Sequence, residues 1–155
     1  MPMRCSDQGL AVLIDREAAK HNAYQDTVGV WTIGVGHTGP EVHEGLVWSD
    51  AQIKEAFAID IGRFESAVND ACKTITLTQN EFDALVSFSF NLGAGALAHG
   101  GDNNGPSGIL RALLAGDKVG AAKAFDNWHI PSEITSRRNA EREQFKGTQV
   151  TARIP

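Results

Sequence analysis

The sequence predicts an α+β fold that is mainly helical and contains one small sheet. Apolar residues recur at helical intervals over most of the chain, and serine, threonine or aspartate stands at the N-cap position of several of these segments. Only residues 22 to 38, with an extension to about 47, have the pattern of strands. A chain of 155 residues, 42% of them hydrophobic, is sufficient for one domain with a sizeable core.

The first predicted helix covers residues 6 to 17. Ser6 stands at its N-cap position, and three apolar residues share one face of the helix, namely Leu10, Leu13 and Ile14. The next predicted helix is long, about 22 residues over 50 to 71, because apolar residues keep the helical interval throughout. Ser49 and Gln52 stand at the spacing of a capping box at its start.

A third helix is predicted to lie at the centre of the core. Thr78 and Glu81 form a second capping box before the segment FDALVSFSFNL, whose apolar residues cover nearly the whole circumference of a helix. Gly93 is a suitable C-terminal stop. The turn-rich segment HGGDNNGPSG, residues 99 to 108, is predicted to be a surface loop.

The C-terminal part is predicted to contain three more helices. Two short ones, ILRALLAG and DKVGAAKAFDNW, are separated at Gly116, and Asp117 is the N-cap of the second. The last helix has the sequence SEITSRRNAEREQFKG and ends near Gly147.

The strand region is unusual because it contains three glycines, although glycine weakens a strand. From residue 31 onward, the apolar side chains of Trp31, Ile33 and Val35 alternate with Thr32, Gly34 and Gly36. Since side chains alternate between the faces of a strand, one face is apolar and the other is nearly free of side chains. Such a face would let a flat ligand approach the backbone. The glycines would equally relieve crowding at a tight hairpin, and this stretch alone does not separate the two interpretations.

Two acidic residues upstream favour the ligand-binding interpretation. Glu17 lies near the end of the first helix, and Asp26 lies at the start of the hairpin. Cleavage of a glycosidic bond needs a carboxylic acid that protonates the leaving oxygen and a carboxylate on the other face of the sugar. With 19 acidic residues in the chain, this pair is informative only as part of a larger ordered set.

That set is E-x6-Y-x-D-x2-G-x2-T-I-G-x-G-H, which begins at Glu17 and ends at His37. It resembles the phage-type lysozymes, the endolysins of tailed phages and their prophage relatives. The resemblance covers nearly the whole chain, because TQNEFDALVSFSFNLGAGAL is similar to the central helix of the family. LLAGDKVGAAKAFDNW and RRNAEREQFKG are similar to its C-terminal helices.

The resemblance implies a lysozyme-like fold with two lobes in one catalytic domain. The small lobe, with the antiparallel sheet, would cover about residues 18–50, and a linking helix about 50–71. The helical lobe would cover about 78–147 together with the first helix, about 6–17. Such enzymes hydrolyse the β-1,4 bond between N-acetylmuramic acid and N-acetylglucosamine in peptidoglycan, usually with inversion. No metal or organic cofactor is implied.

The resemblance also assigns roles to residues. Glu17 matches the general acid, Asp26 the acid that holds the water on the far side of the sugar, and Thr32 the threonine that helps to place that water. Arg137 aligns with the arginine that pairs with the catalytic glutamate, the alternative being an ordinary surface arginine. The remaining residues expected to bind substrate or to support the site are Tyr24, Gly34, Gly36 and His37.

Several positions carry their own expectations. Ala18 stands where the family has glycine, and we expect it to lengthen the first helix, since alanine is a better helix former. His37 is expected to pair with a carboxylate of the small lobe rather than to bind a metal, because no metal-ligand spacing is present. Cys5 and Cys72 are expected to be free thiols.

Charge and the functional alternatives complete the sequence-based hypothesis. The formal net charge of -5 argues against nucleic acid or an anionic membrane as a partner. The resemblance to phage-type lysozymes implies the peptidoglycan glycan strand as the partner, bound by a monomer without stable membrane insertion. The N-terminus lacks the pattern of a signal peptide, so holin-dependent release from the host cytoplasm to the periplasm is expected, the alternative being a secreted effector that another machine delivers. The alternatives are a catalytically silent peptidoglycan-binding domain and a transglycosylase that forms an anhydro product.

Overall fold

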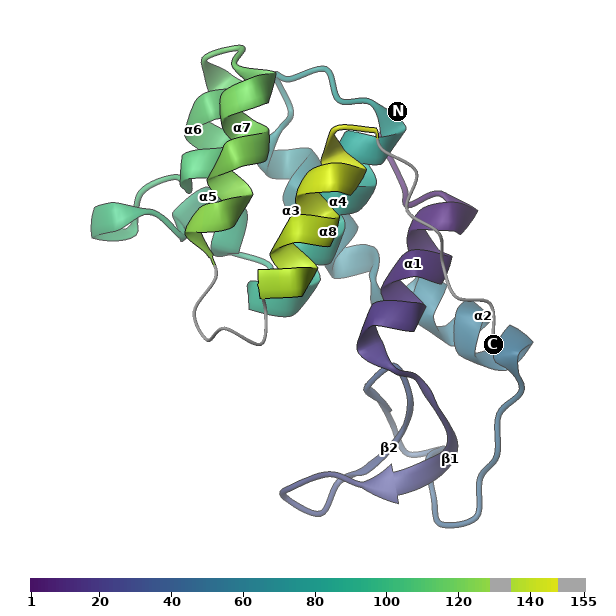
Figure 1. Ribbon diagram of the computed structural model, residues 1–155. Coiled ribbons are helices and arrows are strands. Elements are labelled where there is room, and N and C mark those ends of the chain that lie inside the picture. The colour runs from purple at the N-terminus through teal and green to yellow at the C-terminus, as the bar shows by residue number, and fades with distance from the viewer. Residues whose placement is uncertain (129–134, 148–155) are drawn as a thin grey trace.

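A computed structural model describes residues 1–128 and 135–147 of the chain. It confirms the mainly helical α+β fold with a small three-stranded sheet (Figure 1). In chain order the elements are α1 (Asp7–Glu17), β1 (Lys20–Gln25), β2 (Trp31–Gly34), β3 (His37–Thr38), α2 (Asp50–Asp60), α3 (Gly62–Ala71), α4 (Gln79–Leu92), α5 (Ala96–His99), a 3-10 turn (Asp102–Asn104), α6 (Gly108–Leu114), α7 (Lys118–Ala124), a second 3-10 turn (Phe125–Asn127) and α8 (Thr135–Phe145).

Helix α4 is the centre of the helical lobe, as its sequence predicts. Every residue from Glu81 to Ser89 is buried, and α1, α3, α5 and α8 pack around the helix. Phe82, Leu85 and Phe88 are fully buried. A helix without an exposed face in its middle turns is stable only inside a core, which explains the apolar residues on all of its sides.

The predicted helix caps are confirmed. The side chains of four residues each accept a hydrogen bond from the backbone N–H three positions later, and these residues are Ser6, Ser49, Thr78 and Asp117. Both predicted capping boxes are complete, because Gln52 and Glu81 also accept from the N–H of their cap residues. Each pair of bonds satisfies backbone donors that have no partner within the helix.

The long helix predicted over residues 50 to 71 is wrong as one continuous element. It is divided at Ile61 into α2 and α3. Ile61 is fully buried, and its backbone has φ -75° and ψ -10°, which is close to 3-10 geometry. Its carbonyl accepts from the N–H groups of both Phe64 and Glu65, at 2.9 and 3.1 Å. Gly62 follows directly and favours the break, because glycine is a poor helix former.

The predicted effect of Ala18 is also wrong, because the residue ends α1 instead of extending it. Ala18 is in the left-handed conformation, with φ 52° and ψ 62°, and its N–H donates to the carbonyl of Asp15. Strand β1 begins only two residues later, at Lys20. The chain must therefore leave the helix at this position, and this tertiary requirement overrides the helix propensity of alanine.

The three strands form an antiparallel sheet in the order β1-β2-β3. Tyr24 pairs with Thr32, and Thr32 pairs in turn with Thr38 of β3. Figure 1 shows this sheet at one end of the molecule, with α1 leading directly into it from the helical lobe. The isolated bridge between Asn22 and Val47 agrees with the predicted extension of strand structure to about residue 47.

The other sequence-based expectations on the fold stand as follows. Cys5 and Cys72 are free thiols, as expected. Residues 100 to 107 form an irregular segment that contains one 3-10 turn, while His99 and Gly108, the ends of the predicted loop, belong to α5 and α6. Residues 132 to 134, predicted to begin the last helix, lie outside the described residues. Within the described ranges, none of the helices has the length and apolar character needed to cross a bilayer.

Candidate active site

Glu17 is the last residue of α1, at the point where the chain passes from the helical lobe into the sheet. Its carboxylate accepts a hydrogen bond from the Nη1 of Arg137, which lies on α8. The side chains of Glu17 and Arg137 are 23% and 12% exposed, so the ion pair is only partly open to solvent. The structure therefore confirms the predicted pairing and excludes the ordinary surface arginine.

Arg137 is held by two further groups. Its Nη2 donates to the carbonyl oxygen of Ser87 on α4 at 3.1 Å. Its Nε lies 3.4 Å from the Oε2 of Glu141, one turn along α8. The neighbour of Glu17 in α1 joins the same network, since Arg16 donates to the Ser87 hydroxyl at 3.0 Å and to Gln144 at 2.8 Å. The three helices α1, α4 and α8 thus meet through charged and polar side chains next to Glu17.

Glu141 and Arg138 are the buried ion pair of this network, and both residues are 0% exposed. The Arg138 Nε lies 3.0 Å from the Glu141 Oε1, and the Ser87 hydroxyl donates to Oε2 at 2.5 Å. Arg138 also donates to Asn91 at 2.6 Å. Burial raises the pKa of Glu141 above its usual range, an effect that Arg138 and Arg137 oppose. Burial likewise lowers the pKa of Arg138, against the attraction of Glu141.

Sequence reasoning did not find Glu141, Ser87 or Arg16. The spacing of Arg137 and Glu141, four residues apart on a helix, was a usable signal that the two side chains meet. Nothing in the local sequence indicates that Glu141 is buried, because α8 is rich in charged residues and resembles a surface helix.

Asp26 and Thr32 lie on the β1–β2 hairpin and are held by its backbone. The Asp26 Oδ1 accepts from the N–H groups of Val28 and Val30, both at 2.9 Å, so this carboxylate closes the hairpin turn. Within the described residues, no hydrogen bond involves its Oδ2. Thr32 is 4% exposed, and its hydroxyl donates to the Val30 carbonyl at 3.0 Å.

The expectation that Gly34 offers bare backbone to a ligand is wrong. Gly34 is buried, and a Cβ at this position would meet the indole ring of Trp48 at 3.3 Å. Strand β2 also ends at Gly34, so the predicted alternation does not continue to Gly36. Gly29, Gly34 and Gly36 have φ angles of 84°, 65° and 68°, which explains these glycines by backbone conformation. Gly36 is exposed, with open space where a Cβ would be.

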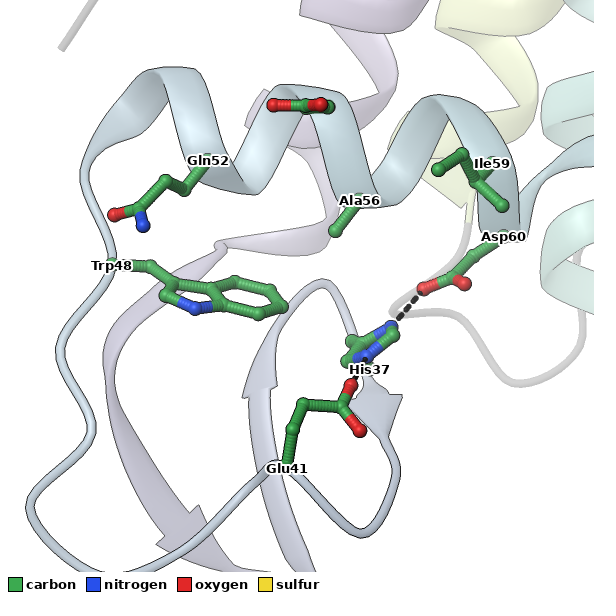
Figure 2. A pocket seen from close by; sticks show the side chains of 8 residues that line it. His37, Glu41, Trp48, Gln52, Ala56, Ile59 and Asp60 are labelled. Atoms are coloured by element: carbon green, nitrogen blue, oxygen red, sulfur yellow. Dashed lines mark hydrogen bonds and ion pairs between the residues drawn. The ribbon is translucent and has the colours of Figure 1, made fainter.

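His37 has carboxylate partners, as predicted, although one of them lies outside the small lobe. Its Nε2 lies 2.6 Å from Glu41, in the loop after β3, and its Nδ1 lies 2.6 Å from Asp60 on α2. The Trp48 ring lies beside it, with the two ring centroids 5.2 Å apart. Figure 2 shows this group below α2. Its members line a hollow of about 300 Å³. Glu17, Asp26 and Thr32 do not line this hollow. We therefore regard His37 as a clamp between the sheet and α2.

The aromatic residues near these groups have mainly packing roles. Trp128 contacts Phe88 of α4 edge-on, with ring centroids 5.3 Å apart. Tyr24 is 38% exposed on β1 and stands opposite Thr32 in the sheet. Trp31 is half-buried at the start of β2. Among the described residues, no group of three or more histidine, cysteine, aspartate or glutamate side chains is arranged to hold a metal ion.

Comparisons with known proteins show the family to which the chain is similar. The Phage lysozyme family model matches residues 15–141. An endolysin of Acyrthosiphon pisum secondary endosymbiont phage 1 is 32% identical over 93% of this chain and 99% of its own length. An endolysin of Bacillus phage B103 is 33% identical over 92% of this chain, which spans only 54% of that longer relative.

The solved structures include a crystal structure of a P22 lysozyme mutant that is similar over 93% of this chain and 99% of its own, with a TM-score of 0.82 and 32% identity. The family match extends from just before Glu17 to the buried Glu141, so it contains both sides of the site described above. The chain therefore belongs to the phage lysozyme family of glycoside hydrolases.

Proposed function

We propose that this chain is an endolysin muramidase that hydrolyses the β-1,4 bond between N-acetylmuramic acid and N-acetylglucosamine in peptidoglycan. The observation that carries this proposal is the position of Glu17, a partly exposed carboxylate at the junction of the two lobes that is held by Arg137 from α8. Family membership supports peptidoglycan as the substrate, because the chain is similar to one endolysin over 99% of the length of that relative.

In this mechanism Glu17 is the general acid. Its proton goes to the glycosidic oxygen as the bond from that oxygen to the anomeric carbon breaks. A water molecule attacks the anomeric carbon from the opposite face and loses its proton to Asp26. The new bond therefore lies on the face opposite the departed oxygen, which is inversion.

The hairpin orients Asp26 and Thr32 so that both side chains can hold that water. The Asp26 Oδ1 is fixed by two backbone N–H groups, which orients the carboxylate and leaves Oδ2 to accept from water. The Thr32 hydroxyl donates its proton to the Val30 carbonyl, so its lone pairs remain available to a donor such as water. Tyr24, Gly36 and His37 support the hairpin in this proposal, and Gly34 supports it through the Trp48 contact.

One requirement of the mechanism conflicts with the resting geometry. A general acid must be protonated when the bond breaks, whereas the guanidinium of Arg137 favours the ionised form of Glu17. We propose that substrate binding loosens this ion pair as it displaces water from around Glu17. The partly exposed position of Glu17 is suited to such a change.

The test compares wild type with Glu17→Gln on purified peptidoglycan. We expect the variant to lose activity by about a thousandfold, the size of a general-acid contribution, while its melting temperature confirms that it is folded. Clearance of the wall at the wild-type rate by Glu17→Gln would contradict the proposal. Complete inactivity of the wild-type protein would favour a silent binding domain instead.

Mass spectrometry of the released muropeptides separates hydrolysis from the transglycosylase alternative. Hydrolysis adds one water molecule to each cleaved bond. A transglycosylase instead leaves an anhydro sugar, whose mass is lower than that of the hydrolysis product by one water molecule, about 18 Da. We expect hydrated products, because a second carboxylate, Asp26, is present on the hairpin to hold the water.

The biological setting is part of the proposal. We propose that residues 1–155 act as a single monomeric catalytic domain on glycan strands, and that a holin releases the enzyme from the host cytoplasm to the periplasm. The endolysin relatives support the action on peptidoglycan. Expression in bacteria with and without a co-expressed holin tests it, and lysis at equal rates in both cultures would contradict the holin requirement.

A further inference from the structure

Arg137 lies between two carboxylates with different surroundings. On one side it donates to Glu17, whose side chain is 23% exposed. On the other side its Nε lies 3.4 Å from Glu141, whose side chain is 0% exposed. Glu141 is fixed by Ser87 and Arg138, so it stays in place whether or not Arg137 is bound to Glu17.

The balance of charge around Glu17 depends on Glu141. Three guanidinium groups face this region, Arg16 from α1 and Arg137 and Arg138 from α8, while α4 contributes only the neutral Ser87 and Asn91. Glu17 and Glu141 are the carboxylates that pair with Arg137, and Asp15 acts on Arg16 from the exposed face of α1. Removal of the Glu141 charge would leave Glu17 as the main counter-ion of the arginines.

We propose that Glu141 is a positioning residue of the proposed muramidase reaction: by sharing Arg137, it weakens the hold of this arginine on Glu17 and lets Glu17 take up the proton that it must donate. The inference rests on the proposed function and explains how the Glu17–Arg137 pair opens. When a sugar displaces water, Arg137 keeps a buried anionic partner in Glu141 and is not left as an unpaired charge in a dry site. Glu17 is then released without leaving an isolated guanidinium.

The geometry favours this exchange over a purely structural role for Glu141. Arg137 is anchored to α4 by the Ser87 carbonyl, at 3.1 Å from Nη2, and its Nε already lies 3.4 Å from Glu141 before Glu17 is released. The Ser87 hydroxyl links the two residues further, because it donates to Glu141 and lies 3.4 Å from the same Nη2. Burial raises the pKa of Glu141 and the arginines oppose this effect, while the Arg138 Nε at 3.0 Å gives its carboxylate a cationic partner inside the core.

The experiment measures the titration of the Glu17 carboxyl carbon by ¹³C magnetic resonance and the pH profile of wall hydrolysis. In Glu141→Gln the shape of the side chain is kept and its charge is lost. We expect the pKa of Glu17 to fall by about one unit, and the alkaline limb of the rate profile to move down with it. Activity at neutral pH would then fall about tenfold.

Two further variants complete the test. Glu141→Asp keeps the charge but withdraws it from Arg137 by one methylene, so we expect a smaller downward shift of the Glu17 titration. If Glu141→Gln does not fold, Glu141→Asp provides the test of the inference. Glu81→Gln is the matched control, because Glu81 is also a buried carboxylate paired with a cation, with its Oε2 2.5 Å from Lys118, at the distant end of α4. Glu81→Gln should reduce the stability of the protein but leave both the Glu17 titration and the pH profile of hydrolysis unchanged.

The outcomes separate this inference from the proposed function. An unchanged Glu17 titration in both Glu141 variants would overturn the inference, even if the wild-type enzyme cleaves peptidoglycan. A downward shift would support it even if the wall assay fails, because the carboxyl titration does not depend on turnover.

Discussion

The two sides of the proposed site are held in different ways. On the helical side, Glu17 is bound by a residue 120 positions away, and its neighbour Arg16 by residues 71 and 128 positions away. On the hairpin side, Asp26 is bound by backbone groups no more than four positions away, and Thr32 by a carbonyl two positions away. The acid therefore depends on how three helices pack, whereas the water-holding groups depend on one local turn.

This difference separates stability from activity on the hairpin but couples them on the helical side. A change in the buried network alters both the fold and the environment of Glu17, because the same arginines serve both. A change on the hairpin that preserves the turn can remove chemistry and leave the fold intact. The following expectations test that contrast, from the largest effect to the smallest.

Loss of the buried cation should be the most damaging change. Arg138→Met leaves the buried Glu141 without its closest cationic partner, and we expect the free energy of unfolding to fall by about 3 kcal/mol or more. Urea denaturation measures this effect. The control is Arg111→Met, because the exposed Arg111 side chain donates, among the described residues, only to the Pro106 carbonyl, so its loss should change stability by less than about 0.5 kcal/mol. Equal stability of the two variants would break the contrast between the regions.

On the hairpin, Asp26→Asn should reduce activity without reducing stability. The amide oxygen of asparagine can still accept from the N–H groups of Val28 and Val30, while the base for the attacking water is lost. We expect activity to fall about a hundredfold and the melting temperature to change by less than about 2 °C. Asp26→Ala should reduce both activity and stability, because no side-chain acceptor remains for the N–H groups of Val28 and Val30. Full activity of the Asn variant would remove Asp26 from the mechanism.

The connection between α1 and β1, which joins the two regions at Ala18, can be stabilised. Ala18→Gly relieves a left-handed alanine, and we expect a gain of about 1 kcal/mol in the free energy of unfolding. Ala11→Gly, in the middle of α1, is the matched control and should lose about 1 kcal/mol, because glycine weakens a helix interior. A loss of stability in both variants would show that the conformation at residue 18 is not strained.

The smallest effect concerns the His37 clamp and depends on pH. Burial disfavours the imidazolium, but hydrogen bonds to Glu41 and Asp60 outweigh it and raise the pKa of His37. A raised pKa stabilises the fold below the unfolded value, about 6.5, and this contribution is lost as the pH rises through the folded value. His37 similarly lowers the pKa of Glu41, and that contribution is lost as the pH falls through the lowered value.

We therefore expect the stability difference between wild type and His37→Gln to be largest between about pH 4.5 and 6.5 and to shrink toward pH 9. Urea denaturation at several pH values is the suitable measurement, because the denaturant guanidinium chloride is a salt and would screen the ion pairs. A difference that stays constant over this range would mean that the clamp does not depend on the charge of His37.

The contrast between the regions also decides what the sequence could predict. The caps at Ser6, Ser49 and Thr78 were predicted because each depends on a contact three residues away. The break at Ile61 was missed although Gly62 is a local signal for it, because the apolar residues keep their helical interval across the break. The conformation of Ala18 was missed for a related reason: the turn into β1 is a tertiary requirement that opposes local propensity.

The candidate site follows the same rule. The pairing of Arg137 with Glu17 was predicted only through the resemblance to phage-type lysozymes, because no local signal links residues 120 positions apart. The burial of Gly34 was missed because Trp48, the residue that covers it, belongs to a different segment of the small lobe. Glu141 was missed because its burial comes from the packing of α8 on α4.

The stereochemistry of the product tests most directly the claim that the two regions act on opposite faces of one sugar. Proton magnetic resonance on a short glycan oligomer, recorded in the first minutes of cleavage, distinguishes the anomer formed by the enzyme from the one formed by later mutarotation. With Glu17 as the acid on one face and a water held by Asp26 on the other, the first product should be the α-anomer. A β-anomer as the first product would contradict this arrangement.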